Sequence, residues 1–442
     1  MSNITEKTLP DTPREATLTD VLEAREKRVS CQQRLLERFR KPVVCFTLNI
    51  AGPVKVDEAT RYAFRVGRER LTEGLKTMGF DLLGSETLVS VAGQEYLAAV
   101  NAPAEALKRL CVSLEELDQL GRLFDLDVIG TDGQKLERGA ERSCLVCGKP
   151  GRGCASRRVH PVDEIRAVTQ GIIRAHQTRE QTRRVATAAV QSLLDEVCVT
   201  PKPGLVDREN NGSHRDMDIF TFTASASALY PYFEACCLAG LRDRALDAAT
   251  AFRRLQSLGI EAERVMRQAT HSVNTHKGAI FTLGVLCAAA GRAGDTCVEP
   301  WLTCCAELAA SYRSSGVRGE VADGLPSVAA YGLPALRAAR EKGCSFNDQC
   351  LAALLALIAH VEDTNMVSRG GSLVARRARA EAQALIDARE SGAEIRPLPM
   401  LMEAMNRDYV ALNLSPGGCA DLLAATLLVD RITQSSSETM EE

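Results

Sequence analysis

The chain lacks several features that would place it in a class at once. No apolar run reaches the roughly 18 residues that a membrane-spanning helix needs, and the longest candidate, residues 350–361, ends in charge. The N-terminus is polar and acidic, without the apolar core of a secretory signal. The formal net charge is -3, so electrostatics give no reason to expect binding to nucleic acid or to an anionic membrane.

Common catalytic and nucleotide-binding motifs are also missing. The sequence contains no G-x-x-x-x-G-K-[ST], G-x-G-x-x-G, G-x-S-x-G or H-E-x-x-H pattern, so any use of a nucleotide would be unconventional. Sixteen cysteines are present, but a chain of 442 residues can bury a core without disulfides. We therefore expect reduced, mostly buried thiols and a cytoplasmic location.

The pattern of predicted elements changes partway along the chain. Strands are expected at 43–50, 88–91, 96–100 and 122–129, with a hairpin turn at 131–134 leading into 135–138; helices are expected at 20–39, 57–78 and 103–120. After about residue 162 the strand signals vanish and alanine rises. The helices expected there cover 163–176, 183–198, 219–240, 243–257, 261–270, 277–290, 300–314, 327–341, 347–361, 372–390 and 399–431. The sequence therefore predicts a multidomain protein, with an α+β domain at 17–175 followed by an all-α domain at 183–435.

A long polar segment, PKPGLVDRENNGSHRDM at 201–217, lies between two stretches rich in alanine and leucine. Its prolines and glycines exclude a regular helix, and its charges exclude a buried strand. Such a loop is typical of a functional site or of a flexible linker, but a linker is usually simpler in composition. We therefore favour a site, whose candidate residues are Lys202, Asp207, Asn210, His214 and Asp216.

Two acidic residues, Asp125 and Asp127, alternate with apolar residues in the predicted strand at 122–129. Strand alternation places both carboxylates on one face of the sheet. Paired carboxylates suit Mg²⁺, which prefers oxygen ligands and can neutralise charge on a pyrophosphate leaving group. The alternative is a solvated strand face that happens to carry two acids.

Cysteines cluster near the end of the first domain. Cys144-x-x-Cys147 is followed by Cys154 and His160, the four ligands of a Cys₃His zinc site. The alternative is a set of ordinary buried cysteines in a glycine-rich loop.

The segment Asn274-Thr275-His276-Lys277-Gly278 precedes an apolar helix. Asn274 or Thr275 is expected to cap that helix, with His276 and Lys277 in its first turn. Cations are disfavoured at a helix N-terminus, and a bound phosphate chain would reverse the penalty. The alternative is an exposed cationic turn that costs about 0.3 kcal/mol.

A third polar segment follows the apolar helix expected at 347–361. His360, Asp363 and Thr364 are expected to share one helix face, and Asn365 and Arg369-Gly370-Gly371 come next. Acid, amide and arginine at a helix end suit metal and phosphate handling, although a glycine-rich C-cap would also explain the segment. Together with the loops at 201–217 and 274–278, it predicts one shared polyphosphate pocket.

These segments resemble two known families. TPKPGLVDRENNGSHRDM, NTHKGAIFTLG, GLPS and HVEDTNMVSRGG, within residues 185–431, resemble the triphosphoribosyl-dephospho-coenzyme A synthases. FTLNIAGPVK, GRLFDLDVI and RSCLVCGKPGRGCASRRVH, within residues 20–175, resemble the apo-citrate lyase phosphoribosyl-dephospho-coenzyme A transferases. Nearly the whole chain therefore resembles a bifunctional fusion of the two, which implies a nucleotidyltransferase-like fold for the α+β domain.

The resemblance implies two successive reactions. In the second domain the 2'-hydroxyl of 3'-dephospho-CoA attacks the anomeric carbon of the ATP ribose, so that adenine leaves and the triphosphate is kept. In the first domain a serine of the apo-citrate lyase acyl carrier (gamma) subunit attacks the innermost phosphate, and pyrophosphate leaves. The two activities would share the intermediate triphosphoribosyl-dephospho-CoA.

The resemblance also supports roles at matching positions. Asp125 and Asp127 become Mg²⁺ ligands for the departing pyrophosphate. His276, Lys277 and Arg369, assisted by Lys202, are expected to hold the triphosphate. Three acids are candidates for binding a metal, stabilising a cation or acting as the base: Asp207, Asp216 and Asp363. His214 is an alternative base. Three amides are candidates for substrate binding: Asn210, Asn274 and Asn365.

Two alternatives remain open from the sequence. The same chemistry primes the carrier of malonate decarboxylase, although the FTLNIAGPVK and cysteine-rich segments favour the citrate branch. The second is a non-enzymatic, zinc-stabilised protein whose helical domain senses a nucleotide.

Overall fold

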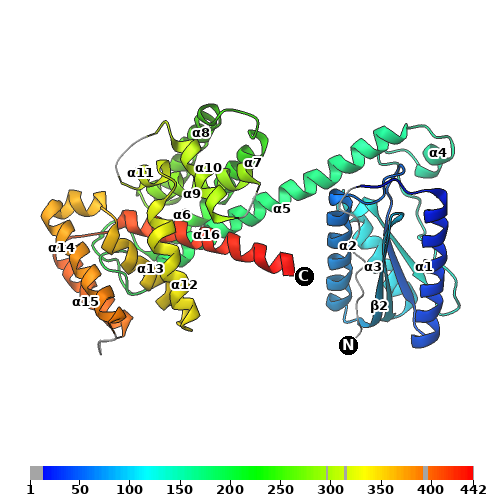
Figure 1. The fold of residues 1–442 in the computed structure, drawn as a ribbon, viewed down its shortest axis with the longest axis horizontal. Coiled ribbons are helices and arrows are strands. Elements are labelled where there is room, and N and C mark those ends of the chain that lie inside the picture. The colour runs from blue at the N-terminus through cyan, green and yellow to red at the C-terminus, as the bar shows by residue number, and fades with distance from the viewer. Residues whose placement is uncertain (1–12, 295–296, 313–315, 392–396, 442) are drawn as a thin grey trace. The chain divides into compact units, whose positions relative to one another are not determined.

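The computed structural model describes residues 13–294, 297–312, 316–391 and 397–441. The chain divides into two compact units, Met1–Gln177 and Thr178–Glu442, which are drawn in Figure 1. One long helix, α5 (Val162–Cys198), contributes to both units. Its continuity corrects the expected pair of helices at 163–176 and 183–198, because no proline or glycine interrupts residues 172–198.

The first unit contains a four-stranded antiparallel sheet with the order β2-β3-β1-β4. The strands are β1 (Val43–Leu48), β2 (Asp81–Ser90), β3 (Gly93–Asn101) and β4 (Phe124–Ile129). The expected short strand pair is thus a full hairpin, β2–β3. The strand expected at 135–138 is wrong, because only an isolated bridge joins Lys135 to Ile129 in the described residues.

Helices cover both faces of this sheet. On one face, α2 (Glu58–Thr77), α3 (Ala104–Glu116) and the start of α5 enclose a core that includes Phe46 and Phe64. On the other face, α1 (Leu18–Phe39) packs through Cys31 and Leu35. Asp57 caps α2 as predicted, since its Oδ1 accepts the Thr60 N–H at 2.8 Å. The α+β prediction is therefore confirmed.

The second unit is built from helices, as predicted. Short elements supplement the longer helices: a 3-10 turn (Gly121–Leu123) and α4 (Gly151–Ser156) in the first unit, and a π turn (Val328–Gly332) and α11 (Val317–Ala322) in the second. The longer helices of the second unit are α6 (Ile219–Ala228), α7 (Tyr230–Arg242), α8 (Ala248–Ala269), α9 (Lys277–Ala293), α10 (Val298–Ala309), α12 (Leu333–Glu341), α13 (Phe346–His360), α14 (Thr364–Glu390), α15 (Leu398–Ala411) and α16 (Gly417–Glu441).

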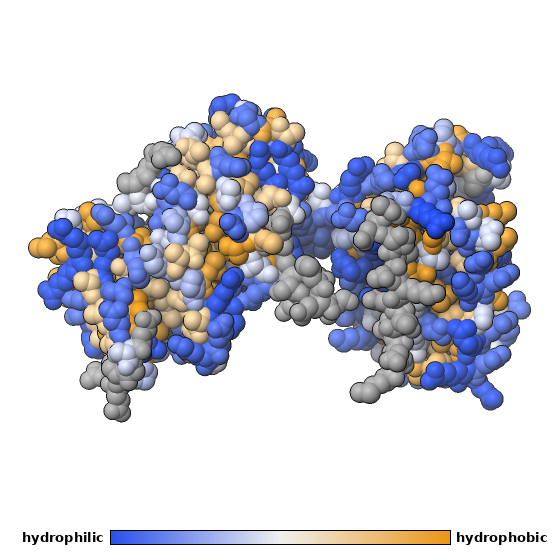
Figure 2. Space-filling view, in the orientation of Figure 1, coloured by the Kyte–Doolittle hydropathy of each residue, from blue (hydrophilic) through white to orange (hydrophobic). Residues whose placement is uncertain are grey.

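Helix α9 lies in the core of this unit, and residues 279–291 are almost entirely buried. Small residues let its neighbours approach: a Cβ added at Gly240 on α7 would lie 1.9 Å from the carbonyl oxygen of Ala288. Hydrophilic residues cover much of each unit in the view of Figure 2.

Three expected helix boundaries are wrong. The helices expected at 243–257 and 261–270 are one helix, α8, because Gly259 lowers helix propensity without breaking the helix. The helix expected at 219–240 divides at Leu229, just before Pro231. The helix expected at 399–431 divides into α15 and α16, because Pro416 cannot continue a helix.

Within the described residues, no single helix combines the length and the apolar composition needed to cross a membrane. Helices α13 and α14 meet both requirements only as a pair, with a bend of 56° between them.

Candidate active site

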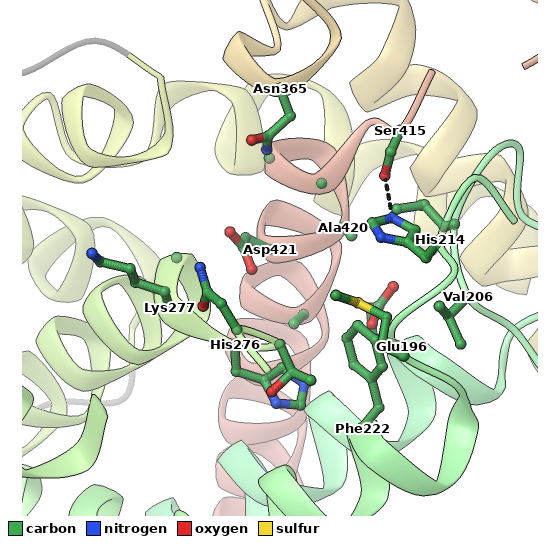
Figure 3. A pocket seen from close by; sticks show the side chains of 18 of the residues that line it. Glu196, Val206, His214, Phe222, His276, Lys277, Asn365, Ser415, Ala420 and Asp421 are labelled. Carbon is green, nitrogen blue, oxygen red and sulfur yellow. Dashed lines mark hydrogen bonds between the residues drawn. The ribbon is translucent and has the colours of Figure 1, made fainter. Parts of the chain in front are cut away.

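The second unit contains a cavity of about 460 Å³ where the three predicted polar segments meet (Figure 3). The loop at 201–217, the start of α9 and the start of α14 all contribute to its wall. The predicted residues that line it are Lys202, His214, Asp216, Asn274, His276, Lys277, Asn365 and Arg369. Folding therefore brings together segments that are up to about 160 positions apart in the chain.

Asp207 and Asn210 do not line this cavity; they shape the loop. Buried Asp207 accepts backbone N–H groups from Lys202 at 2.9 Å and Glu209 at 2.8 Å. Asn210 Oδ1 accepts the N–H of Gly212 at 2.8 Å. Hydrogen bonds of this kind stabilise turns, so the arrangement gives Asp207 a structural position rather than a catalytic one.

Asp363 is also outside the lining. Its Oδ1 caps α14 by accepting the N–H groups of Asn365 and Met366, and its Oδ2 accepts the N–H of Cys419 on α16 at 2.9 Å. Burial raises the pKa of Asp363, although these hydrogen bonds oppose the shift. The expected shared face with His360 is wrong, because α13 ends at His360 and Asp363 lies between two helices.

Three long helices of the described chain begin at the cavity, α9, α14 and α16, as does the short helix α11. Unpaired N–H groups and the helix dipole make the N-terminus of each long helix attractive to an anion. Glycines bring two of these ends together, since a Cβ at Gly417 would lie 2.9 Å from Asn365 Nδ2 and one at Gly418 would lie 2.9 Å from Asp363 Oδ2. The contribution of α16 was not predicted, because it depends on the break at Pro416.

Besides Lys202, three cationic side chains line the same cavity. Lys277, whose side chain is 41% exposed, has its Nζ 3.7 Å from Glu263. Arg369 donates to the backbone oxygen of Ser213 at 3.2 Å. The third cation, Arg318, was not predicted; its sequence signal is the polar G-V-R-G segment at 316–319. Its guanidinium donates to the Tyr312 hydroxyl at 2.9 Å and lies over that ring.

Lys202 is different, because its charge is already neutralised. The side chain is only 1% exposed, and its Nζ donates to both the backbone oxygen and the carboxylate of Glu196 on α5. Burial raises the pKa of Glu196, and the Lys202 ammonium opposes that shift. Removing either partner would leave a buried charge unpaired, so Lys202 supports the cavity wall rather than offering a free cation.

His276 does not carry the positive charge expected of it. Burial, with a contribution from Lys202, lowers its pKa to about 3, so the imidazole is neutral at pH 7. It occupies the N-cap position of α9, but no side chain caps this helix. The expected caps, Asn274 or Thr275, are therefore wrong. The Thr275 hydroxyl instead donates to Ser225 Oγ at 2.8 Å. His276 Nδ1 lies 2.7 Å from that Ser225 oxygen. In the described part of the chain its buried Nε2 has no hydrogen-bond partner.

Asp421 on α16 is a further acid that was not predicted (Figure 3). A Cβ at Gly278 would lie 1.9 Å from Asp421 Oδ2, so the absence of a side chain there allows the carboxylate to reach the start of α9. Burial, followed by the nearby charges of Glu196 and Asp363, raises the pKa of Asp421 well above its ordinary value. A single acid in an apolar helix gives no sequence signal.

His214 and Asp216 from the loop at 201–217 also line the cavity. His214 Nε2 is 2.9 Å from the Ser415 hydroxyl, and Nδ1 is 3.5 Å from Arg369. Burial and the Arg369 charge lower the pKa of His214, whereas Asp216 opposes this. A neutral imidazole in this position can accept a proton.

In the first unit, the predicted alternation of β4 is confirmed. Asp125 and Asp127 are partly exposed on one face, while Phe124, Leu126 and Val128 are buried on the other. Asp127 forms an ion pair of 2.5 Å with Lys135. The side chain of Asp125 is 47% exposed and lies 3.9 Å from Arg142.

The predicted sulfur-rich cluster is also assembled in this unit. The ligand atoms of Cys144, Cys147, Cys154 and His160 all lie within 4.8 Å of one another.

Both units match models of transferase families. Residues 16–176 match the family described as apo-citrate lyase phosphoribosyl-dephospho-CoA transferase. Residues 182–306 and 292–440 match the family described as ATP:dephospho-CoA triphosphoribosyl transferase. The protein is therefore an enzyme with two transferase domains.

Two similar proteins carry both domains. One, "Protein CitXG" from Haemophilus influenzae, is 32% identical over 93% of this chain and 95% of its own length. Another, "Protein CitXG" from Leuconostoc mesenteroides subsp. cremoris, is 29% identical over 95% of this chain and 97% of its own length. A "Probable 2-(5''-triphosphoribosyl)-3'-dephosphocoenzyme-A synthase" from Vibrio cholerae is 38% identical over 57% of this chain and 89% of its own length. The chain belongs to the family of fused proteins that join these two transferases, as its motifs predict.

Proposed function

We propose that the helical unit converts ATP and 3'-dephospho-CoA into triphosphoribosyl-dephospho-CoA and adenine. The α+β unit then transfers the phosphoribosyl-dephospho-CoA group to a serine of the apo-citrate lyase acyl carrier subunit and releases pyrophosphate. The family matches support both reactions. The structural observation that carries the proposal is a cavity lined by the N-termini of α9, α14 and α16, by several cations and by the buried acid Asp421.

The anion-binding features of the cavity suit the triphosphate of ATP, which the first reaction leaves intact. The N-termini of α9, α14 and α16 offer backbone N–H groups. Lys277, Arg318 and Arg369 supply the positive charge that balances the phosphates. Asn274 and Asn365 are both exposed at the edge of the cavity and can donate further hydrogen bonds.

Two other polar groups of the cavity suit the reacting ribose. Cleavage of the bond between ribose and adenine develops positive charge on the anomeric carbon, which a carboxylate stabilises. Asp421 is the acid that we assign to this role; burial raises its pKa, and the positive charge that develops on the ribose favours its ionised form. His214, kept neutral by burial and Arg369, is our candidate base for the attacking hydroxyl.

His276 is suited to the leaving adenine. The Ser225 oxygen accepts a hydrogen bond from Thr275. We therefore assign the hydrogen of the Ser225 hydroxyl to His276 Nδ1, which lies 2.7 Å away. The proton of the neutral imidazole is then on Nε2, which is buried and without a partner among the described residues. We assign this N–H to an acceptor nitrogen of adenine, which gains electron density as the bond to ribose breaks.

In the first unit we propose Mg²⁺ at Asp125 and Asp127. Two carboxylates on one strand face supply the oxygen ligands that this ion prefers, and the ion would neutralise charge on the leaving pyrophosphate. Lys135 and Arg142 lie next to these carboxylates. Mg²⁺ would compete with the two cations for the carboxylate oxygens. A nucleotidyltransferase-like arrangement of this unit remains part of the proposal.

The direct test is an assay of the full chain with ATP and 3'-dephospho-CoA. We expect free adenine to accumulate only when both substrates are present, and added apo-carrier to gain the mass of the group while pyrophosphate appears. Absence of adenine with both substrates and Mg²⁺ present would contradict the proposal for the helical unit. Adenine release without any carrier modification would contradict the proposal for the α+β unit.

The malonate decarboxylase carrier is the second candidate substrate. The N-terminal family match names citrate lyase, which favours the citrate carrier. Supplying the two carriers in parallel separates them, because we expect faster modification of the citrate lyase subunit. The non-enzymatic alternative is set aside, since both units belong to transferase families.

The cysteines support the expected cytoplasmic location of this reaction sequence. Most of the sixteen are buried, as is typical of reduced thiols. Free thiols persist in reducing compartments.

The Lys277→Ala variant is expected to raise the KM for ATP about tenfold, because it removes one charge-assisted contact to the triphosphate. Initial rates of adenine release at varied ATP concentration measure the change. Lys342→Ala, which removes an exposed lysine beyond the end of α12, is the matched control and should leave the KM unchanged. An unaltered KM for Lys277→Ala would exclude this side chain from the ATP site.

A further inference from the structure

Four metal-binding side chains converge in the segment between β4 and α5. Cys144 and Cys147 lie in a turn, Cys154 lies on α4, and His160 precedes α5. Their ligand atoms are within 4.8 Å of one another, and the Sγ atoms of Cys147 and Cys154 are 3.5 Å apart. Tetrahedral Zn²⁺ with Zn–S bonds of about 2.3 Å places its ligand atoms roughly 3.8 Å apart. The observed spacing therefore matches one tetrahedral metal ion.

The backbone around the first two cysteines forms a tight turn. The N–H of Gly148 donates to the carbonyl of Cys144 at 3.0 Å, and the N–H of Cys144 donates to the carbonyl of Lys149 at 2.6 Å. Gly148 has a φ of 71°, a left-handed conformation that glycine adopts without strain. This turn keeps the C-x-x-C pair at the spacing used in structural zinc sites.

His160 is oriented as a metal ligand. Its Nδ1 lies 3.2 Å from a carboxylate oxygen of Glu164, one turn further on in α5. Its Nε2 is buried and has no hydrogen-bond partner in the part of the chain that the structure describes. A carboxylate on one ring nitrogen and a metal on the other is the usual arrangement of a zinc-binding histidine.

A disulfide bond or simple core packing accounts for this cluster less well than a metal ion does. A disulfide between Cys147 and Cys154 would need a sulfur separation of about 2.0 Å and would leave Cys144 and His160 without a role. Packing in the hydrophobic core does not account for the cysteines either, because Cys147 is exposed and Cys144 and Cys154 are only partly buried.

We propose that Cys144, Cys147, Cys154 and His160 bind one structural Zn²⁺ ion in a closed Cys₃His site. Three thiolates and a neutral imidazole fill all four positions, and the thiol protons are released to solvent on binding. This site leaves no open position for a substrate, so its role is to hold the segment in place. The proposal goes beyond the transferase reactions and does not depend on them.

The segment that the zinc would hold lies next to the acid pair of β4. Arg142, two residues before Cys144, donates to the backbone oxygen of Phe124 at 2.8 Å and approaches Asp125 to 3.9 Å. Arg122 in turn donates to the backbone oxygen of Ser143 at 2.6 Å. Zinc binding therefore fixes the position of Arg142 relative to Asp125, which makes Arg142 a positioning neighbour of the proposed Mg²⁺ site.

The test is metal analysis of the full chain purified in reducing buffer without chelator. We expect about one zinc ion per chain, and, after exchange with Co²⁺, the thiolate-to-cobalt charge-transfer absorption of a tetrahedral site. Cys154→Ser and His160→Ala are expected to retain less than about a tenth of the zinc. Cys344→Ser, which changes a partly buried cysteine in the other unit, is the matched control and should retain all of it.

Two results would overturn the proposal. One is a wild-type chain that contains no zinc and develops no thiolate–cobalt absorption when the metals are added. The other is a soluble Cys154→Ser or His160→Ala variant that keeps as much zinc as the control. If either variant does not fold, titration of Co²⁺ into chelator-treated wild type decides alone, since saturation at about one equivalent is required.

Discussion

The Asp125→Asn variant will modify the carrier at least about a hundredfold more slowly than the wild type while releasing adenine from ATP at the normal rate. The substitution keeps the size of the side chain and removes the negative charge that would hold Mg²⁺ near the leaving pyrophosphate. Since the side chain is 47% exposed and lies 3.9 Å from the nearest cation, folding should be little affected. A hundredfold loss corresponds to about 2.7 kcal/mol of transition-state stabilisation.

The measurement supplies the purified intermediate and follows the mass of the carrier and the release of pyrophosphate. Adenine release by the same preparation shows that the helical unit is intact. Asp81→Asn, an exposed acid at the start of β2 and on the opposite edge of the sheet, is the control and should behave as wild type. Normal carrier modification by Asp125→Asn would show that the acid pair is a solvated strand face, the alternative that the sequence left open.

The Asp421→Asn variant will show the reciprocal loss. Adenine release should fall by about a hundredfold or more, because an amide cannot stabilise the positive charge on the ribose carbon as a carboxylate does. Transfer from supplied intermediate to the carrier should remain at the wild-type rate. The two variants thus divide the activities between the two units.

The stability of Asp421→Asn distinguishes loss of chemistry from loss of folding. Folding raises the pKa of Asp421 through burial and nearby acids, so the folded state loses stability relative to the unfolded state as the pH rises from the ordinary pKa towards the raised one. An amide does not ionise, so the variant avoids this loss and its Tm at pH 7 to 8 should be unchanged or higher. Asp408→Asn, an exposed acid on α15, is the control for both measurements. A variant with wild-type kcat/KM for ATP would remove Asp421 from the reaction.

Much of the cavity was predictable because its loops are rich in residues that interrupt helices. The segments at 201–217 and 274–278 stand out against the apolar helices around them, and both line the cavity. The roles within those segments were less predictable. Asp207 and Asp363 have the composition of catalytic acids, yet both bind backbone N–H groups that hold loops and helix ends together.

The site residues that the sequence did not predict were missed for one physical reason. Glu196 lies in the last turn of α5 and Asp421 in the first turns of α16, where a single acid has no recognisable pattern. Their pKa values are raised only because distant segments bury them. His276 was assigned a positive charge from its neighbours in the sequence, but its enclosure in the folded protein makes it neutral.

The sequence by itself determined the two domains, the helical character of the second, the acid pair on one face of a strand and the spacing of the three clustered cysteines and His160. Each of these depends on local periodicity or on neighbours a few residues away, which the order of residues specifies directly. Only the tertiary structure decided which polar groups face the cavity, which are consumed by backbone hydrogen bonds and which lose their charge. Those properties depend on solvent exclusion by segments far apart in the chain, and no local pattern encodes them.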